Sequence, residues 1–538
     1  MDTFPASLLA LAVTAPILVG LILLAGRDLP RSFTSGFAFG GFAIPAVLAP
    51  WLLVLWTDPA TAPQQFQSVG FWGFGFALNG LGAPLLAMTS LVGFAAGVKA
   101  LNQEVEGRNT YLGLILFMLG GTLGVFGTNH LVGFYFFHEF ALIPTFILTL
   151  FWGGEGRRPA AMQMAIFLTA GAMASLAGIL IAVDAAGVEY GAATFENVAL
   201  GLQNAKHIPA AVGALVLFGL GTLASLFPFH SWAAPGYSAA PTPVSMLHAG
   251  ALKKFGLYGI ILLGLSSLDI TGGSLGTWFL WFAVANVVLV GLICLAQRDL
   301  KQLLSWSSVA HMGPIFLGIW VCGASGKADG LDAAAFLMVA HGLSCAALFL
   351  LANAVRARAG TYRLDELGGL ATRTPILAAL FIAATMASIG LPGFGNFWGE
   401  VGIFLALRDQ SLWLQALVAS TVVISAVYAL RAVASTFFGP ASEALEKRFA
   451  SAPFGDLGWA ERFAACILLG ASLTIGFVPS LITKSVNPVA AGITTFSQHN
   501  AKAPVQAAPA QPAKPGDGHQ AQHQHAVAKI AEPVTSQR

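Results

Sequence analysis

The stretch that decides the fold is residues 240–265, APTPVSMLHAGALKKFGLYGIILLGL. It is longer than the roughly 20 apolar residues that one helix needs to cross the hydrocarbon core of a bilayer. Lys253 and Lys254 lie well inside it. A charge within a membrane span is costly, and such residues commonly have a functional role. The stretch therefore predicts a transmembrane helix that carries part of a functional site.

The composition of the whole chain agrees with a lipid environment. Hydrophobic residues make up 56% of the 538 residues and charged residues 9%, whereas a soluble protein carries roughly 25% charged residues. The net charge of +2 gives no basis for nucleic-acid binding. The cysteines (Cys294, Cys322, Cys345 and Cys466) stand singly in apolar runs, so the sequence holds no pattern for an iron–sulfur cluster, a c-type haem, another metal or a disulfide framework.

Apolar runs of similar length recur almost to the end of the chain. Helices are expected, because lipid cannot satisfy open backbone groups and the short alternating segments of a closed barrel are missing. The predicted fold class is therefore all-α, a polytopic membrane protein of about fourteen transmembrane helices. The predicted spans, within a transmembrane domain over residues 1–484, are 5–26, 35–56, 81–101, 110–127, 130–152, 160–183, 208–228, 241–266, 277–297, 302–323, 331–355, 375–406, 411–438 and 460–482.

Lysine and arginine in the short loops predict the orientation, since they favour the cytoplasmic side. The even-numbered loops hold little beyond Lys206, Lys327 and Arg408. We therefore expect the odd-numbered loops in the cytoplasm and both termini on the periplasmic side of a bacterial inner membrane. The odd-numbered loops hold Arg27, Arg31, Lys99, Arg108, Arg157, Arg158, Arg298, Lys301, Arg356, Arg358, Arg363, Arg373, Lys447 and Arg448.

The end of the chain differs in character. Residues 485–538 are rich in Ala, Pro, Gln and His and show no hydrophobic periodicity. Such a composition cannot bury enough apolar surface to fold. A disordered tail is predicted for this segment.

Few ionisable residues lie within the predicted spans, and each is a candidate. Glu139, with His138 beside it, lies in the span 130–152, and we expect its carboxyl to exchange protons. The alternative is a structural hydrogen bond between helices. Lys253 and Lys254 predict buried amines that can release a proton, with His248 nearby. The alternative for the lysines is that their side chains reach out to the membrane surface.

Three further candidates follow along the chain. His311 and His341 can pass protons near neutral pH, although each could also be a hydrogen-bonded core residue. Glu400 follows the sequence Gly390-Leu391-Pro392-Gly393, which is expected to interrupt its helix and line a polar cavity. An acid, a lysine pair, two histidines and an acid in this order predict a row of proton-exchanging groups. Nucleotide and flavin motifs are missing from the sequence.

Several motifs together resemble the antiporter-like membrane subunits of respiratory complex I. They are FHEFALIP, FPFHSW, AAPTP, LKKFGLYG, RDLKQLLSWSSVAHMG, AHGLSCAALFLL, DELGGLA and ASIGLPGFGNFWGE, and they run in order from about residue 70 to 440. The M type (chain 4 in mitochondria) is the most similar, because Glu400 stands where the L- and N-type relatives carry a lysine. The resemblance implies a fourteen-helix core with two broken helices, here the spans that contain Pro241–Pro243 and Pro392.

The resemblance also implies roles and partners. Glu139 matches the essential acid of the fifth helix, Lys254 the M-type lysine of the eighth helix, and Lys253 the position used by the N type. His341 and Glu400 match positions in the eleventh and twelfth helices. The chain is then expected to bind no cofactor, with NADH, FMN, Fe–S clusters and quinone held by other subunits, and to contact L-type and N-type antiporter-like subunits, the lipid bilayer and protons, but no nucleic acid.

One position departs from the family pattern. The family carries a lysine seven residues before the histidine of HSW, which pairs with the fifth-helix acid; here that histidine is His230 and the position is Leu223. His138, His248 or one of the paired lysines could replace it, or the subunit could pump differently or not at all. The alternative functions are a subunit of a multi-subunit Na⁺/H⁺ antiporter, a membrane-bound hydrogenase relative, and a structural spacer.

Overall fold

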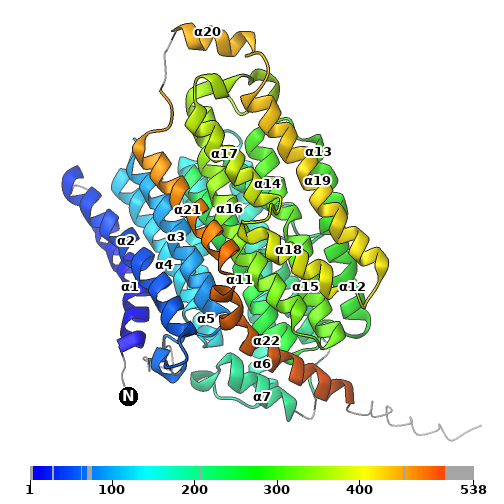
Figure 1. The fold of residues 1–538 in the computed structure, drawn as a ribbon. Coiled ribbons are helices and arrows are strands. Elements are labelled where there is room, and N and C mark those ends of the chain that lie inside the picture. Colours follow the sequence, from blue (N-terminus) through cyan, green and yellow to red (C-terminus); the bar gives the residue numbers. More distant parts are fainter. Residues whose placement is uncertain are drawn as a thin grey trace, which may run out of the picture. The chain divides into compact units, whose positions relative to one another are not determined.

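The computed structural model describes residues 4–26, 29–61, 63–68, 75–205, 207–209, 211–451 and 455–502. Within the described ranges, the chain up to Gln498 forms the first of two compact units. The described residues are helical apart from turns, connections and isolated β-bridges, and Figure 1 shows the helices of the first unit packed side by side. The predicted all-helical fold is confirmed.

The helices have the following bounds. The longer ones are α1 (Phe4–Ala25), α2 (Arg31–Thr57), α3 (Gly82–Leu101), α4 (Arg108–Phe126), α5 (Leu131–Trp152), α6 (Arg157–Ala186), α12 (Gly273–Ala285), α14 (Leu300–Ala310), α15 (Met312–Ser325), α16 (Asp329–Ala359), α19 (Leu412–Phe437), α21 (Trp459–Phe477) and α22 (Ser480–Lys502). The shorter ones are α7 (Phe195–Gln203), α8 (Ala211–Leu223), α9 (Ala233–Ala239), α10 (Thr242–Leu247), α11 (Lys254–Gly259), α13 (Gly291–Ala296), α17 (Pro375–Ser388), α18 (Gly395–Ala406) and α20 (Glu443–Ser451). Three π-helical turns continue these helices: η4 (His248–Leu252), η5 (Ile260–Leu265) and η6 (Asn286–Val290).

Twelve helical stretches in the described ranges are long and apolar enough to cross a membrane. The shorter apolar helices α8 and α17 begin inside the predicted spans 208–228 and 375–406. A crossing by either would need a second segment, because α8 has 13 residues and α17 has 14. The number of fourteen crossings therefore stays a prediction.

The span 375–406 is broken where the sequence predicts it. Helix α17 ends at Ser388 and α18 begins at Gly395. Between them Gly390 and Gly393 adopt φ of +76° and +102°, a region that glycine enters without steric cost. Pro392, which has no backbone donor, lies in this non-helical connection.

The other predicted break is misplaced. Pro241 is the N-cap of α10 and Pro243 lies in its first turn, where a missing N–H costs no intrahelical hydrogen bond. The helical stretch Thr242–Leu265 is consequently continuous. The discontinuity lies one span earlier, between the end of α8 at Leu223 and the short helix α9.

A buried asparagine supports this first break. Asn286 of η6 accepts a hydrogen bond from the N–H of Phe227 at 2.6 Å and donates to the carbonyl of Ser225 at 3.0 Å. Trp232 donates its indole N–H to the carbonyl of Thr222 at the end of α8, at 3.0 Å. Non-helical backbone at membrane depth needs such partners, because lipid supplies none.

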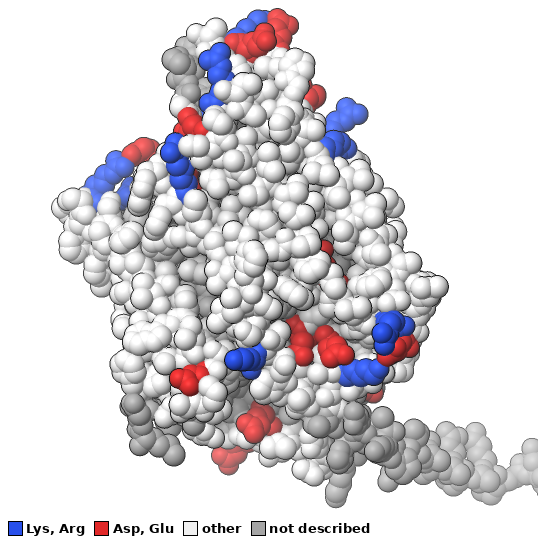
Figure 2. All heavy atoms as spheres, viewed as in Figure 1, with Lys and Arg blue, Asp and Glu red and all other residues white. Residues whose placement is uncertain are grey.

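The core of the first unit is formed by the most completely buried of the candidate spans, α16 and the stretch Thr242–Leu265. Helix α16 packs against α3, α10, α15, α17, α18 and α21. These two stretches carry His341 and the lysine pair, so the predicted site residues lie on the innermost helices. Figure 2 shows few charged side chains across the middle of the face it presents.

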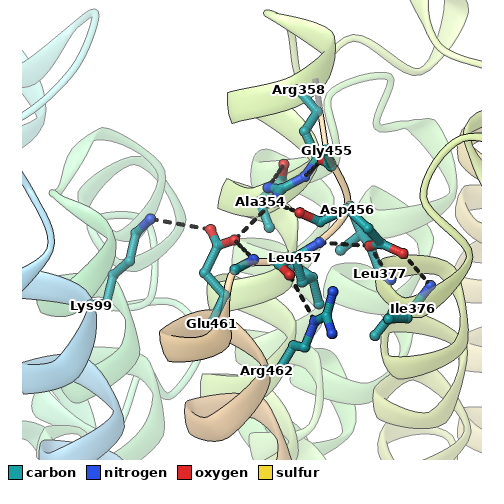
Figure 3. A network of polar contacts seen from close by, with 11 residues as sticks. Lys99, Ala354, Arg358, Ile376, Leu377, Gly455, Asp456, Leu457, Glu461 and Arg462 are labelled. Carbon is teal, nitrogen blue, oxygen red and sulfur yellow. Dashed lines mark hydrogen bonds and ion pairs between the residues drawn. The ribbon is translucent and has the colours of Figure 1, made fainter. Parts of the chain in front are cut away.

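A charged network ties the start of α21 to the core (Figure 3). Arg358 Nη2 of α16 lies 2.8 Å from Glu461 Oε2, and Lys99 Nζ of α3 lies 3.7 Å from Glu461 Oε1. Asp456 accepts the N–H groups of Ile376 and Leu377 at 2.7 and 3.0 Å, which caps the first turn of α17. Lys99 and Arg358, predicted as loop charges, are therefore side chains of helix ends that hold three helices together.

The predicted boundary of the tail needs correction. Helix α22 runs from Ser480 to Lys502, so residues 485–502 are helical. Ile482, Val486, Ala490 and Ile493 are all buried, and their spacing of three or four residues places them on one helix face. This periodicity is present in the sequence but is weakened by the small residues between. The remainder of the predicted tail, residues 503–538, lies outside the described residues.

Candidate functional site

The lysine pair lies at the centre of the candidate site. Lys253 and Lys254 are both fully buried, so neither reaches the membrane surface and the alternative of outward-pointing side chains is wrong. Lys253 Nζ donates to the backbone carbonyl of Ser308 on α14 at 2.5 Å and contacts the Ser308 hydroxyl. Lys254 Nζ lies 2.9 Å from His341 Nδ1 on α16 and 3.3 Å from the carbonyl of Ala249. Because the helix is enclosed on all sides, adjacent lysines reach different neighbours.

Ser308 and His341 connect the two lysines. The Ser308 hydroxyl, which contacts Lys253, lies 3.5 Å from His341 Nε2. The opposite ring nitrogen of His341 faces Lys254. A hydroxyl both donates and accepts, so a proton can pass between the lysines through the serine and the imidazole.

His311 continues the row from His341. The centroids of the two rings are 5.4 Å apart. His311 lies between α14 and α15, with Nδ1 2.7 Å from the carbonyl of Ser307 and Nε2 3.2 Å from the carbonyl of Ser388. Carbonyl oxygens only accept hydrogen bonds, so the neutral ring can donate to one of these carbonyls and the protonated ring to both. His311 is thus placed to hold a proton.

Glu400 lies at the far end of this row. Its side chain is buried, and it lines a cavity of about 20 Å³ together with His311 and Tyr428. That volume accommodates about one water molecule. Tyr428 also contacts the hydroxyl of Ser307 at 2.8 Å. The carboxyl and the imidazole of His311 therefore line the same small cavity between α15, α18 and α19.

The break between α17 and α18 makes room for this carboxyl. A Cβ atom on Gly390 would lie 2.2 Å from Glu400 Oε2. Glycine at this position thus permits the left-handed backbone and also leaves room for the carboxyl. The predicted link between the interrupted helix and Glu400 is a direct contact in the structure.

Glu139 and His138 lie apart from this row. Their side chains approach each other at 3.6 Å on α5, and the Glu139 side chain is 30% exposed. The buried Nε2 of His138 has no hydrogen-bond partner, and its ring packs 5.9 Å from Phe255. In the described part of the chain, no hydrogen bond or ion pair connects either residue to the lysine pair.

A buried leucine occupies the position at which the family carries a lysine. Leu223 is buried in the core at the end of α8. Of the residues considered as replacements, His138 is the one in contact with Glu139. His248 instead stacks on Trp232 and packs against Tyr237, with ring centroids 5.3 and 5.0 Å away. Neighbouring members of the predicted row thus lie together from Lys253 to Glu400: polar contacts reach His341, a ring contact follows to His311, and a small cavity separates His311 from Glu400. Glu139 is outside this row.

Some polar residues of the row were missed by sequence reasoning. Ser307, Ser308 and Tyr428 bridge the titratable groups. The signal for the serines is their place between Lys301 and His311 in an otherwise apolar span. Lys301, predicted as a loop charge, is buried within α14. Tyr428 offers no signal in the sequence, because only the fold brings α19 against α14.

Comparisons with known proteins agree with these features. Residues 128–425 match the family described as NADH:quinone oxidoreductase/Mrp antiporter, transmembrane. An NAD(P)H-quinone oxidoreductase chain 4 of Picosynechococcus sp. is 32% identical over 502 residues, which cover 90% of this chain and 91% of the relative. Another, from Trichormus variabilis, is 30% identical and covers 89% of each chain.

Solved structures share the fold. A chain of respiratory complex I from Thermus thermophilus matches with a TM-score of 0.77 and 28% identity, covering 91% of this chain and 99% of that one. A chain of the Mrp complex from Dietzia sp. matches with a TM-score of 0.76 and 20% identity, covering 92% and 99%; at this identity the likeness concerns the fold alone. From the matched family and the relatives of chain 4, the chain belongs to the NADH:quinone oxidoreductase/Mrp antiporter transmembrane family.

Proposed function

We propose that the chain is the M-type, or chain 4, proton-translocating membrane subunit of a respiratory NADH:quinone oxidoreductase. The observation that carries the proposal is the contact row from Lys253 through Ser308, His341 and His311 to the cavity at Glu400. The similarity to chain 4 relatives over nine tenths of the chain supports the complex-level assignment. NADH, FMN, iron–sulfur clusters and quinone are then bound by other subunits.

The chemistry of the row follows from its contacts. Two ammonium groups on adjacent buried residues repel each other strongly, since little solvent screens them. A proton released from Lys254 has His341 Nδ1 at 2.9 Å as its acceptor. The His341 ring lies 5.4 Å from the ring of His311, which can take the next proton once it has given its own to Glu400. Glu400 receives the proton as a carboxylate across the small cavity. Each transfer leaves one group neutral and its neighbour protonated, so the charge state of one residue controls the next.

Placement in the membrane completes the proposal. The Arg- and Lys-rich loops lie on the cytoplasmic side of a bacterial inner membrane, and both termini lie on the periplasmic side. The partly exposed carboxyl of Glu139 lies on a face of α5 that also exposes Phe136 and Ile143. Such a carboxyl needs a polar partner in lipid. We assign this face to contact with a neighbouring antiporter-like subunit of the L or N type.

The test uses the complete complex in inverted membrane vesicles. Glu400→Gln and Lys253→Gln should lower NADH-driven proton uptake sharply at normal assembly, with quinone reduction falling in parallel in a coupled complex. Glu443→Gln is the matched control, because Glu443 is exposed and pairs with Lys447 on the same short helix. Normal proton uptake in both variants would refute the row. Ion uptake that needs Na⁺ and continues without NADH would instead assign the chain to an antiporter.

A further inference from the structure

Lys301 is a buried lysine that the row described above does not include. It lies in the first turn of α14 and is 7% exposed. Its Nζ donates to the carbonyl of Ala240 at 2.6 Å, at the end of α9. In the described part of the chain, no ion pair joins it to a carboxylate.

A purely structural role does not account for this lysine well. The hydroxyl of Ser245, whose nearest acceptor is the carbonyl of Tyr237 at 2.7 Å, lies 3.3 Å from the carbonyl of Ala240. A neutral side chain could supply a second hydrogen bond without the cost of burying an ammonium group. An ammonium has three N–H donors, and the described contacts of Lys301 use one of them. The presence of a buried lysine at this position therefore points to a function that needs a titratable amine.

The polar face of α14 leads from Lys301 to Lys253. Residues 301, 305 and 308 are spaced by four and three positions, so they share one helix face. Ser305 donates its hydroxyl to the carbonyl of Lys301 at 2.8 Å. Ser308 contacts Lys253 Nζ through both its carbonyl and its hydroxyl. Lys301 is thus the outer end of a buried strip whose inner end is the lysine pair.

The outer end of the strip lies beside the Arg-rich loops. The N–H of Leu300 donates to the carbonyl of Tyr362 at 2.8 Å, and that of Leu364 to the carbonyl of Arg298 at 2.9 Å. These bonds attach the start of α14 to the connection that follows α16. Lys301 therefore lies at the end of its helix that is predicted to face the cytoplasm.

We propose that Lys301 is the proton-uptake residue that loads Lys253 from this side, an inference that rests on the proposed function. The Lys301 ammonium gives one N–H proton to a hydroxyl of the Ser305–Ser308 strip, and that strip releases a proton to the nitrogen lone pair of Lys253. Lys301 becomes neutral and Lys253 becomes an ammonium, so no net charge is created. Lys301 then takes a new proton from the cytoplasmic side.

The experiment compares three substitutions in the complete complex, in inverted vesicles. Lys301→Gln keeps a donor for the Ala240 carbonyl but loses the titratable amine. Lys301→Arg keeps both the donor and the charge but does not release a proton. Lys301→His provides a group that can exchange protons. Lys327→Gln is the control, since Lys327 is an exposed lysine paired with Asp409.

The proposal expects NADH-driven proton uptake to be lost in Lys301→Gln and Lys301→Arg, with normal assembly, and to recover in part in Lys301→His. A structural role predicts the opposite order, with Lys301→Arg close to wild type and Lys301→His impaired. Normal uptake in Lys301→Gln or Lys301→Arg would overturn the proposal. If Glu400→Gln and Lys253→Gln lower uptake while the Lys301 variants do not, the uptake residue is wrong and the proposed function stands.

Discussion

Gly390→Ala tests how the break between α17 and α18 shapes the acid site. The substitution has two separable costs. An L-residue at φ +76° costs roughly 1–2 kcal/mol relative to glycine. The new Cβ would lie 2.2 Å from Glu400 Oε2, but this oxygen ends a flexible side chain. The carboxyl should therefore move rather than the backbone, at an off-rotamer cost of about 1 kcal/mol.

Gly439→Ala is the matched control, because Gly439 has the same φ of +76° and its added Cβ would meet nothing within 4 Å. We expect Gly390→Ala to destabilise the purified chain in detergent by about 1 kcal/mol more than the control in denaturant titrations. This excess should vanish when both substitutions are measured in a Glu400→Ala background, because the clashing oxygen is gone.

The functional consequence should be larger than the loss of stability. A displaced carboxyl leaves the cavity of about 20 Å³ that it shares with His311, so proton uptake in vesicles should fall in Gly390→Ala and not in Gly439→Ala. If the two variants pump equally, the contact between the break and Glu400 has no functional role and the reasoning is refuted.

Three further predictions concern stability. Asn286→Leu leaves the N–H of Phe227 and the carbonyl of Ser225 without their buried partner. It should lower the free energy of unfolding in detergent by about 2 kcal/mol or more. A smaller loss would show that other contacts stabilise the break after α8. Arg358→Leu removes the closer of the two cationic partners of Glu461 in the network of Figure 3 and should cost about 3 kcal/mol. Arg363→Leu, at an exposed pair, should cost less than about 1 kcal/mol; equal costs would contradict this. The Arg363 guanidinium beside Asp365 holds the pKa of that carboxyl below its usual range, so the pair stabilises its loop above the usual aspartate pKa and loses this effect as the pH falls through the lowered value. The protection factor of the Leu364 amide, which is its exchange rate corrected for the intrinsic rate at each pH, should therefore fall in acid, and this fall should be absent in Arg363→Ala.

The sequence predicted the helices well because their signal is local. Length and hydropathy identify a span such as α16 without knowledge of its neighbours, and Gly390–Gly393 marks a break by its own backbone chemistry. The break after Leu223 was misplaced because the visible prolines, Pro241 and Pro243, sit in a first turn where they are harmless. The partner that supports the true break, Asn286, lies about sixty residues away, which no local pattern reveals.

The site was predicted in part for the same reason. Ionisable residues in apolar runs are visible one by one, so Lys254, His341 and Glu400 could be named. Their contacts depend on how α14, α16 and α18 pack together, which the sequence does not show. For the same reason, the burial of both lysines and the packing of His248 among aromatic rings became visible only in the structure. Lys301 was misread as a loop charge because it lies close to Arg298 in the sequence, although it belongs to the first turn of α14 and is buried.

The separation of Glu139 from the row explains how the chain tolerates Leu223. A carboxylate that was enclosed within this chain would need a cation, since an unpaired buried charge is very costly. Glu139 is instead 30% exposed, with His138 in contact with it, and the His138 ring packs against Phe255, the residue that follows Lys254 in α11. Loss of the lysine at position 223 therefore leaves no enclosed charge uncompensated within the described part of the chain. Proton exchange between Glu139 and the row therefore needs a bridging group other than the side chains whose contacts are described above.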